Sequence, residues 1–163
     1  METIGESTIA EMCREMTRSR SLSAAMDYLE ARQPDVLHYL MTTFADGRVE
    51  AGMRACQLGW CVYRAFELES EGPIPRIAMR ELAAKADANQ NLLLGTSTTS
   101  LAEFLEVMSL EMAAQPVLMQ FLRQMVATGL SNDLERNRQL IPELVAIFLA
   151  VKTVVDALDA ATN

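Results

Sequence analysis

Apolar residues recur at helical spacing along most of the chain and almost nowhere alternate with polar residues as they do in strands. Over residues 7–18, for example, Ile9, Met12, Cys13 and Met16 form one apolar stripe. Ala, Leu, Met, Glu and Arg, which favour helices, dominate elsewhere. The pattern predicts an all-α fold, a compact bundle of about seven to eight helices with mixed crossing angles.

Prolines, glycines and capping residues divide the chain into these helices. Pro34 and Pro116 each suit the first position of a helix, and Ser100 with Glu103 has the spacing of a capping box. Residues 89–100 are expected to form a polar connector, and Pro142 is expected to bend the last helix. The expected helices cover about residues 7–18, 22–33, 34–45, 48–70, 76–88, 101–115, 116–129 and 133–160.

The run Gly72-Pro73-Ile74-Pro75 is the best candidate for an internal boundary, because Pro75 biases Ile74 toward extended conformations. A break at 71–76 would leave halves of roughly 75 and 88 residues, each near the lower size limit for an independent core. We therefore expect residues 1–163 to form a single helical domain with a possible internal break at 71–76.

Composition supports an ordinary globular domain that needs no cross-links. Half of the 163 residues are hydrophobic, and the three cysteines lack the paired spacing of a disulfide framework or a zinc site. The N-terminus lacks the features of a secretory signal, and the apolar run Leu144–Val151 is too short to span a membrane. We expect a cytoplasmic protein without membrane association, metal or cofactor.

The charge balance argues against nucleic acid as a partner. There are 14 Lys and Arg against 22 Asp and Glu, which gives a formal net charge of -8 and repels phosphate backbones. Residues 80–94 partly match the pattern of a helix-turn-helix, but Asp87 stands where glycine is usual and Gly95 interrupts the second helix. No Lys or Arg occurs between Ala86 and Leu122, so we predict no nucleic-acid binding.

That same stretch contains acidic residues that suggest a cation site. Glu103, Glu106 and Glu111 share one face of a helix, as acidic pairs do in magnesium-dependent phosphohydrolases. Such a site needs a second acidic pair, and the chain offers only Asp156 with Asp159. A solvated acidic face near a helix N-terminus is the favoured interpretation, and a magnesium-dependent enzyme is the least favoured functional hypothesis.

Small residues follow one face of the segment 48–70. Ala51, Ala55 and Gly59 are spaced by four, and Gly52 lies beside them. Because each glycine inside a helix costs about 1 kcal/mol, close packing against another helix should offset the cost. We predict a tight helix crossing at these four residues.

Bulky aromatic residues follow this small strip and suggest a groove. Trp60, Tyr63 and Phe66 come within two turns, and a change from small to bulky residues can shape a pocket beside a crossing. His38, the only histidine, and Tyr39 in the preceding helix complete the candidate groove. No serine or cysteine stands at a diagnostic spacing from His38, so no catalytic pair is predicted and ordinary core packing remains the alternative.

Two segments, 141–155 and 117–126, are apolar nearly all round, and a homodimer that shares them would bury both. Eleven methionines suit either core filling or an adaptable groove. The leading functional hypothesis is a non-enzymatic interaction or regulatory protein that acts through an apolar helical groove, as a homodimer with a possible protein partner. The alternative is a sensor or carrier that holds a small apolar ligand in an internal pocket.

Overall fold

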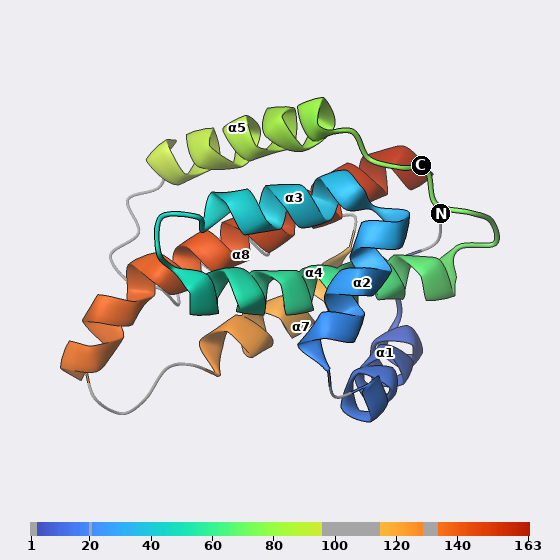
Figure 1. Cartoon of the computed structure of the whole chain (residues 1–163), viewed down its shortest axis with the longest axis horizontal. Helices are drawn as coiled ribbons and strands as arrows, with labels where there is room; N and C mark the ends of the chain where they lie inside the picture. The colour runs from blue at the N-terminus through green and yellow to red at the C-terminus, as the bar shows by residue number, and fades with distance from the viewer. Residues whose placement is uncertain (1–2, 20, 96–114, 129–133) are drawn as a thin grey trace.

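The computed structural model describes residues 3–19, 21–95, 115–128 and 134–163, and within them it contains seven helices and no strand. The all-α prediction is confirmed, and the helices form one compact domain (Figure 1). The helices are α1 (Glu6–Ser19), α2 (Leu22–Arg32), α3 (Pro34–Thr43), α4 (Val49–Glu69), α5 (Met79–Gly95), α7 (Pro116–Ala127) and α8 (Leu134–Thr162).

The core forms where α4 and α8 pack against each other. Helix α4 also contacts α1, α2 and α3, while α8 contacts α5 and α7 (Figure 1). Buried residues of α8 include Leu144, Phe148, Val151 and Val155. One copy of the chain therefore buries most of the apolar face of α8, so this burial does not itself require a second copy.

The small residues of α4 lie where it crosses α3. Gly52 and Gly59 both face α3: a Cβ at Gly52 would lie 3.3 Å from Phe44 Cβ, and one at Gly59 would overlap the side chain of Leu40. Ala51 and Ala55 are buried beside them. The lack of side chains at the two glycines lets α3 approach α4 closely.

Helix α5 differs from the prediction at both ends. It begins at Met79 instead of about residue 76, and it continues to Gly95, so the expected connector over 89–95 is wrong. The prediction failed because polar residues such as Asn89 are typical of an exposed connector. In the structure Asn89 is buried against α8 and hydrogen-bonded to it. Since α5 passes through Asp87 without a turn, residues 80–94 do not form a helix-turn-helix.

Two further sequence predictions concern the C-terminal half of the chain. Helix α8 runs through Pro142 as one element from Leu134 to Thr162. The helix expected from Leu101, with Glu103, Glu106 and Glu111, lies outside the residues that the structure describes.

A buried glutamine fixes the segment that the sequence marked as a possible break. Gln33 precedes Pro34 at the start of α3, and its side chain is fully buried. Its Nε2 donates to the carbonyl of Pro75 at 2.8 Å, and its Oε1 accepts from the backbone N–H of Ile77 at 2.9 Å. Asp35 accepts from the N–H of Met79 at 3.0 Å, so residues 75–79 are attached to the α2–α3 corner.

A second Gln-Pro pair has the same arrangement at the start of α7. Gln115 precedes Pro116, is buried, and has backbone angles close to those of Gln33. Its Oε1 accepts from the N–H of Ile4 at 2.9 Å, and its Nε2 donates to Asp159 at 2.9 Å. The two amides thus join segments that are far apart in the sequence.

We expect Gln33→Ala to lower the free energy of unfolding by about 2 to 4 kcal/mol, because it leaves the buried N–H of Ile77 and the part-buried carbonyl of Pro75 without partners. Urea denaturation followed by circular dichroism measures the change. Gln57→Ala, at an exposed position of α4, is the matched control and should change stability by less than about 0.5 kcal/mol. Equal effects of the two substitutions would contradict this account of Gln33.

Candidate functional site

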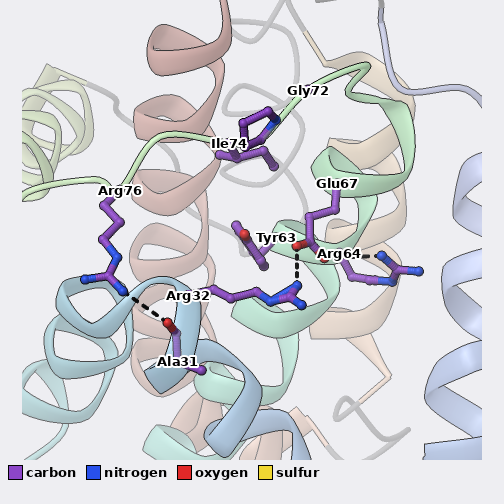
Figure 2. Close-up of a pocket in the computed structure, with 9 residues that line it drawn as sticks. Ala31, Arg32, Tyr63, Arg64, Glu67, Gly72, Ile74 and Arg76 are labelled. Carbon is purple, nitrogen blue, oxygen red and sulfur yellow. Dashed lines mark hydrogen bonds and ion pairs between the residues drawn. The ribbon is translucent and has the colours of Figure 1, made fainter.

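A pocket of about 470 Å³ lies between α2, α4 and the segment 70–78 (Figure 2). Its polar lining contains three guanidinium groups and one carboxylate, and its apolar lining comes mainly from the segment. The lining residues are Ala31, Arg32, Tyr63, Arg64, Glu67, Gly72, Pro73, Ile74 and Arg76.

Glu67 connects the polar side chains at the floor of this pocket. Helix α4 presents Tyr63 and Glu67 on one face, because residues four apart lie one turn apart. Glu67 Oε1 lies 2.7 Å from Arg32 Nη1, and Oε2 lies 3.2 Å from Arg64 Nη1. The hydroxyl of Tyr28 donates to Oε2 at 2.5 Å. The carboxylate therefore holds α2 against α4.

Arg64 also forms an ion pair with a residue of α1. Its Nε and Nη2 donate to the two carboxylate oxygens of Glu15 at 2.6 and 2.9 Å, a bidentate arrangement. Hydrogen bonding to Arg64 lowers the pKa of Glu15, and the same contact raises the pKa of Arg64. The Arg64 guanidinium thus has two carboxylate partners within the protein.

Arg76 differs from the other two arginines. It is exposed, and its Nη2 donates to the backbone carbonyl of Ala31 at 3.3 Å. Figure 2 shows Arg76 reaching from the 70–78 segment toward α2, while Arg32 reaches from α2 toward Glu67. In the part of the chain that the structure describes, no carboxylate forms an ion pair with Arg76.

Two tyrosines near the floor are held in their protonated form. Burial, followed by the negative charge and hydrogen bonding of Glu67, raises the pKa of Tyr63 to about 12. Burial and the hydrogen bond to Glu67 also raise the pKa of Tyr28. The guanidinium of Arg32 lies over the Tyr28 ring, 4.2 Å from its centroid, which adds a cation–π contact to the ion pair with Glu67.

A smaller pocket of about 280 Å³ lies between α3, α5 and α8. Its lining residues are Tyr39, Thr43, Arg48, Ala86, Asn89, Gln90, Ala146, Leu149, Ala150 and Thr153. Burial raises the pKa of Tyr39 in this wall, against the opposing effect of hydrogen bonds to Thr153 and Thr43.

The buried Lys152 lies beside this second pocket. Its side chain is 5% exposed, and its Nζ lies 2.8 Å from Asn89 Oδ1 and 2.7 Å from Asp156 Oδ2. Asn89 in turn donates to Thr153 at 3.1 Å and to Asp156 at 3.0 Å. Because these contacts satisfy the ammonium and the amide, the cluster serves to join α5 to α8.

The structure spreads the predicted groove residues over several places. Tyr63 lines the larger pocket and Tyr39 the smaller one. Trp60 and Phe66 are buried in the core, and His38 is exposed. The residues lie apart because α4 is buried on nearly all sides, so its aromatic side chains enter different parts of the core. A binding role for these five residues stays a prediction.

Sequence reasoning missed the arginines of the larger pocket. Arg32, Arg64 and Arg76 are separated by 32 and 12 positions and belong to no recognisable motif. Glu67 resembled an ordinary surface residue near the end of an amphipathic helix. Only the packing of α2 and the 70–78 segment on α4 brings these charges together.

Comparison with known proteins adds no assignment. No known protein family, curated protein or solved structure matches the chain. Among the residues that the structure describes, no helix is long and apolar enough to cross a membrane. In the same part of the chain, no group of three or more His, Cys, Asp and Glu side chains is placed to hold a metal ion.

The three tyrosines provide a test of the site by pH titration, because the pKa of each is raised in the folded protein. At pH 10, where about half of the tyrosines of an unfolded chain are ionised, the native protein should show much less tyrosinate absorbance at 295 nm. Stability should fall as the pH rises from 10 to about 12, because the unfolded chain loses these protons first.

The same titration in 8 M urea, a concentration chosen to unfold small domains, is the control. It should give a single midpoint near the usual tyrosine value of about 10. Superimposed native and urea curves would contradict the buried, carboxylate-linked environment described for Tyr28 and Tyr63.

Proposed function

We propose that the protein is a non-enzymatic sensor or carrier that binds a small organic ligand in the pocket formed by α2, α4 and the segment 70–78. The observation that carries this proposal is the convergence of polar side chains from these three places around a volume of about 470 Å³. Small-ligand pockets of proteins commonly enclose about 300 to 1,000 Å³. The lining is more polar than the apolar pocket that the sequence suggested.

The chemistry of the lining supports binding in preference to catalysis. Proton transfer near neutral pH requires a group whose pKa lies near the working pH. The pKa of Tyr63 is about 12, and Glu67 already accepts hydrogen bonds from Tyr28, Arg32 and Arg64. Guanidinium groups stay charged and suit the recognition of a ligand.

Filling the pocket tests this proposal. Ala31 is exposed on α2 and lines the pocket, so Ala31→Trp should occupy part of it, whereas Ala24→Trp on the same helix lies outside the lining. Thermal denaturation is measured with a panel of neutral, anionic and cationic metabolites. A ligand of the pocket should raise the melting temperature of the wild type and Ala24→Trp, but not of Ala31→Trp.

Native mass spectrometry of the purified protein complements the panel, because a co-purified ligand appears as a discrete added mass. That mass should be lost in Ala31→Trp and kept in Ala24→Trp. If no compound stabilises the wild type more than Ala31→Trp, and no added mass depends on Ala31, the proposed function is wrong.

An exposed apolar surface favours a second candidate function, that of a homodimeric interaction protein. Met41, Val49 and Met53 are 44%, 67% and 43% exposed and lie where α3 is followed by α4. We call these three residues the corner patch. In an isologous dimer, the corner patch of one copy would pack against the same patch of its partner and remove it from water.

A charge placed on the corner patch tests the dimer. Sedimentation equilibrium should give a mass near twice 18.1 kDa for the wild type, and Met53→Glu should shift it toward the monomer because burying an unpaired carboxylate is costly. Ala84→Glu, at an exposed position of α5, is the control and should leave the mass unchanged. A monomeric wild type at the highest concentration reached would contradict the dimer.

A further inference from the structure

We infer that the ligand of the larger pocket is a small organic carboxylate that carries one negative charge and an apolar body. This inference rests on the proposed function and names the chemical class of its ligand. It depends on the charge balance of the pocket, on the hydrogen bond of Arg76 to a neutral carbonyl, and on the apolar residues of the same lining.

Among the side chains that line the pocket and the Glu15 carboxylate that pairs with Arg64, there is one positive charge in excess. The side chains linked around the pocket contain the guanidinium groups of Arg32, Arg64 and Arg76 and the carboxylates of Glu15 and Glu67. The whole chain has a formal net charge of -8, so a local excess of positive charge is unusual for this protein. One anionic group on the ligand would neutralise it.

Arg76 is the group available to receive that anion. Arg32 and Arg64 are already paired with carboxylates, whereas Arg76 donates at 3.3 Å to the carbonyl of Ala31. A carboxylate accepts two parallel hydrogen bonds from a guanidinium and binds it more strongly than a neutral carbonyl does. A ligand carboxylate therefore has a favourable place at the guanidinium of Arg76.

The other walls of the pocket suit an apolar body. Pro73 and Ile74 from the segment and Ala31 from α2 are apolar residues of the same lining. Figure 2 shows Ala31 beside the guanidinium of Arg76. The ring of Tyr63 contributes a further flat surface from α4. An acid with a short aliphatic chain or a single ring would place its carboxylate at Arg76 and cover these side chains.

The position of Glu67 favours a carboxylate over a phosphate monoester. Glu67 lies in the same lining and keeps its contacts to Arg32 and Arg64, so a second negative charge on the ligand would meet a carboxylate without a further cation to balance it. A phosphate monoester carries between one and two charges at pH 7. The single excess charge of the pocket matches a carboxylate.

Isothermal titration calorimetry with matched probes tests this inference. Acetate, butyrate and phenylacetate are each compared with the primary amide of the same skeleton, and phenyl phosphate is compared with phenylacetate. At least one carboxylate should bind the wild type about tenfold more tightly than its amide, because a guanidinium forms stronger hydrogen bonds to a charged acceptor than to a neutral one. Phenyl phosphate should bind less tightly than phenylacetate.

Substitution of Arg76 tests whether the ligand's carboxylate binds at this guanidinium. Arg76→Gln should weaken the binding of the best carboxylate about tenfold and leave the binding of its amide unchanged. Arg80→Gln, which removes an exposed arginine outside the lining, should leave both affinities unchanged. Circular dichroism of both variants confirms that each is folded.

The outcomes separate this inference from the proposed function. If an amide or another neutral compound binds the wild type but not Ala31→Trp, and carboxylates bind no better, the protein binds a ligand in this pocket but the inference is wrong. Tighter binding of phenyl phosphate, or equal losses in Arg76→Gln and Arg80→Gln, also overturns it. If Ala31→Trp affects the binding of no compound at all, both proposals are wrong.

Discussion

The central position of α4 is the constraint on which the rest of the structure depends. Four helices, α1, α2, α3 and α8, pack around it, so most of its surface must fit against a neighbour. Glycines and alanines meet this requirement where α3 approaches, and large aromatic and aliphatic side chains meet it toward the core. Close packing of this kind leaves few voids. The space that remains between helices is therefore bounded by residues that also make other contacts.

The central position of α4 also requires charge partners for its partly buried polar side chains. Arg64 and Glu67 lie near the end of the helix that α1 and α2 cover, and each is paired with a charged residue of those helices. Burying part of a charge is costly unless it is paired and hydrogen-bonded. The ion pairs thus hold α1 and α2 against α4. Three of the paired side chains, those of Arg32, Arg64 and Glu67, also line the pocket.

The sequence predicted the features that depend on local periodicity and failed on those that depend on distant partners. The apolar stripes and Pro34 and Pro116 were sufficient for the fold class and most helices. The predicted end of α5 was wrong because Asn89 is a residue type typical of connectors. Its hydrogen-bond partners, Lys152 and Thr153, lie on α8 and are not apparent from the local sequence. The arginines of the pocket were missed for the same reason, since Arg32 and Arg76 acquire a common surrounding only through tertiary packing.

The attachment of the segment 70–78 has a consequence for how this protein can diversify. Residues 70–78 form no helix, and Gln33 and Asp35 hold their C-terminal part through the backbone groups of residues 75, 77 and 79. Backbone hydrogen bonds do not depend on which side chains the attached residues carry. The exposed positions 72 and 73 can therefore vary while the chain path to residue 76 is kept. Under the proposed function, specificity for the apolar part of a ligand could then change without a change in the scaffold that positions Arg76.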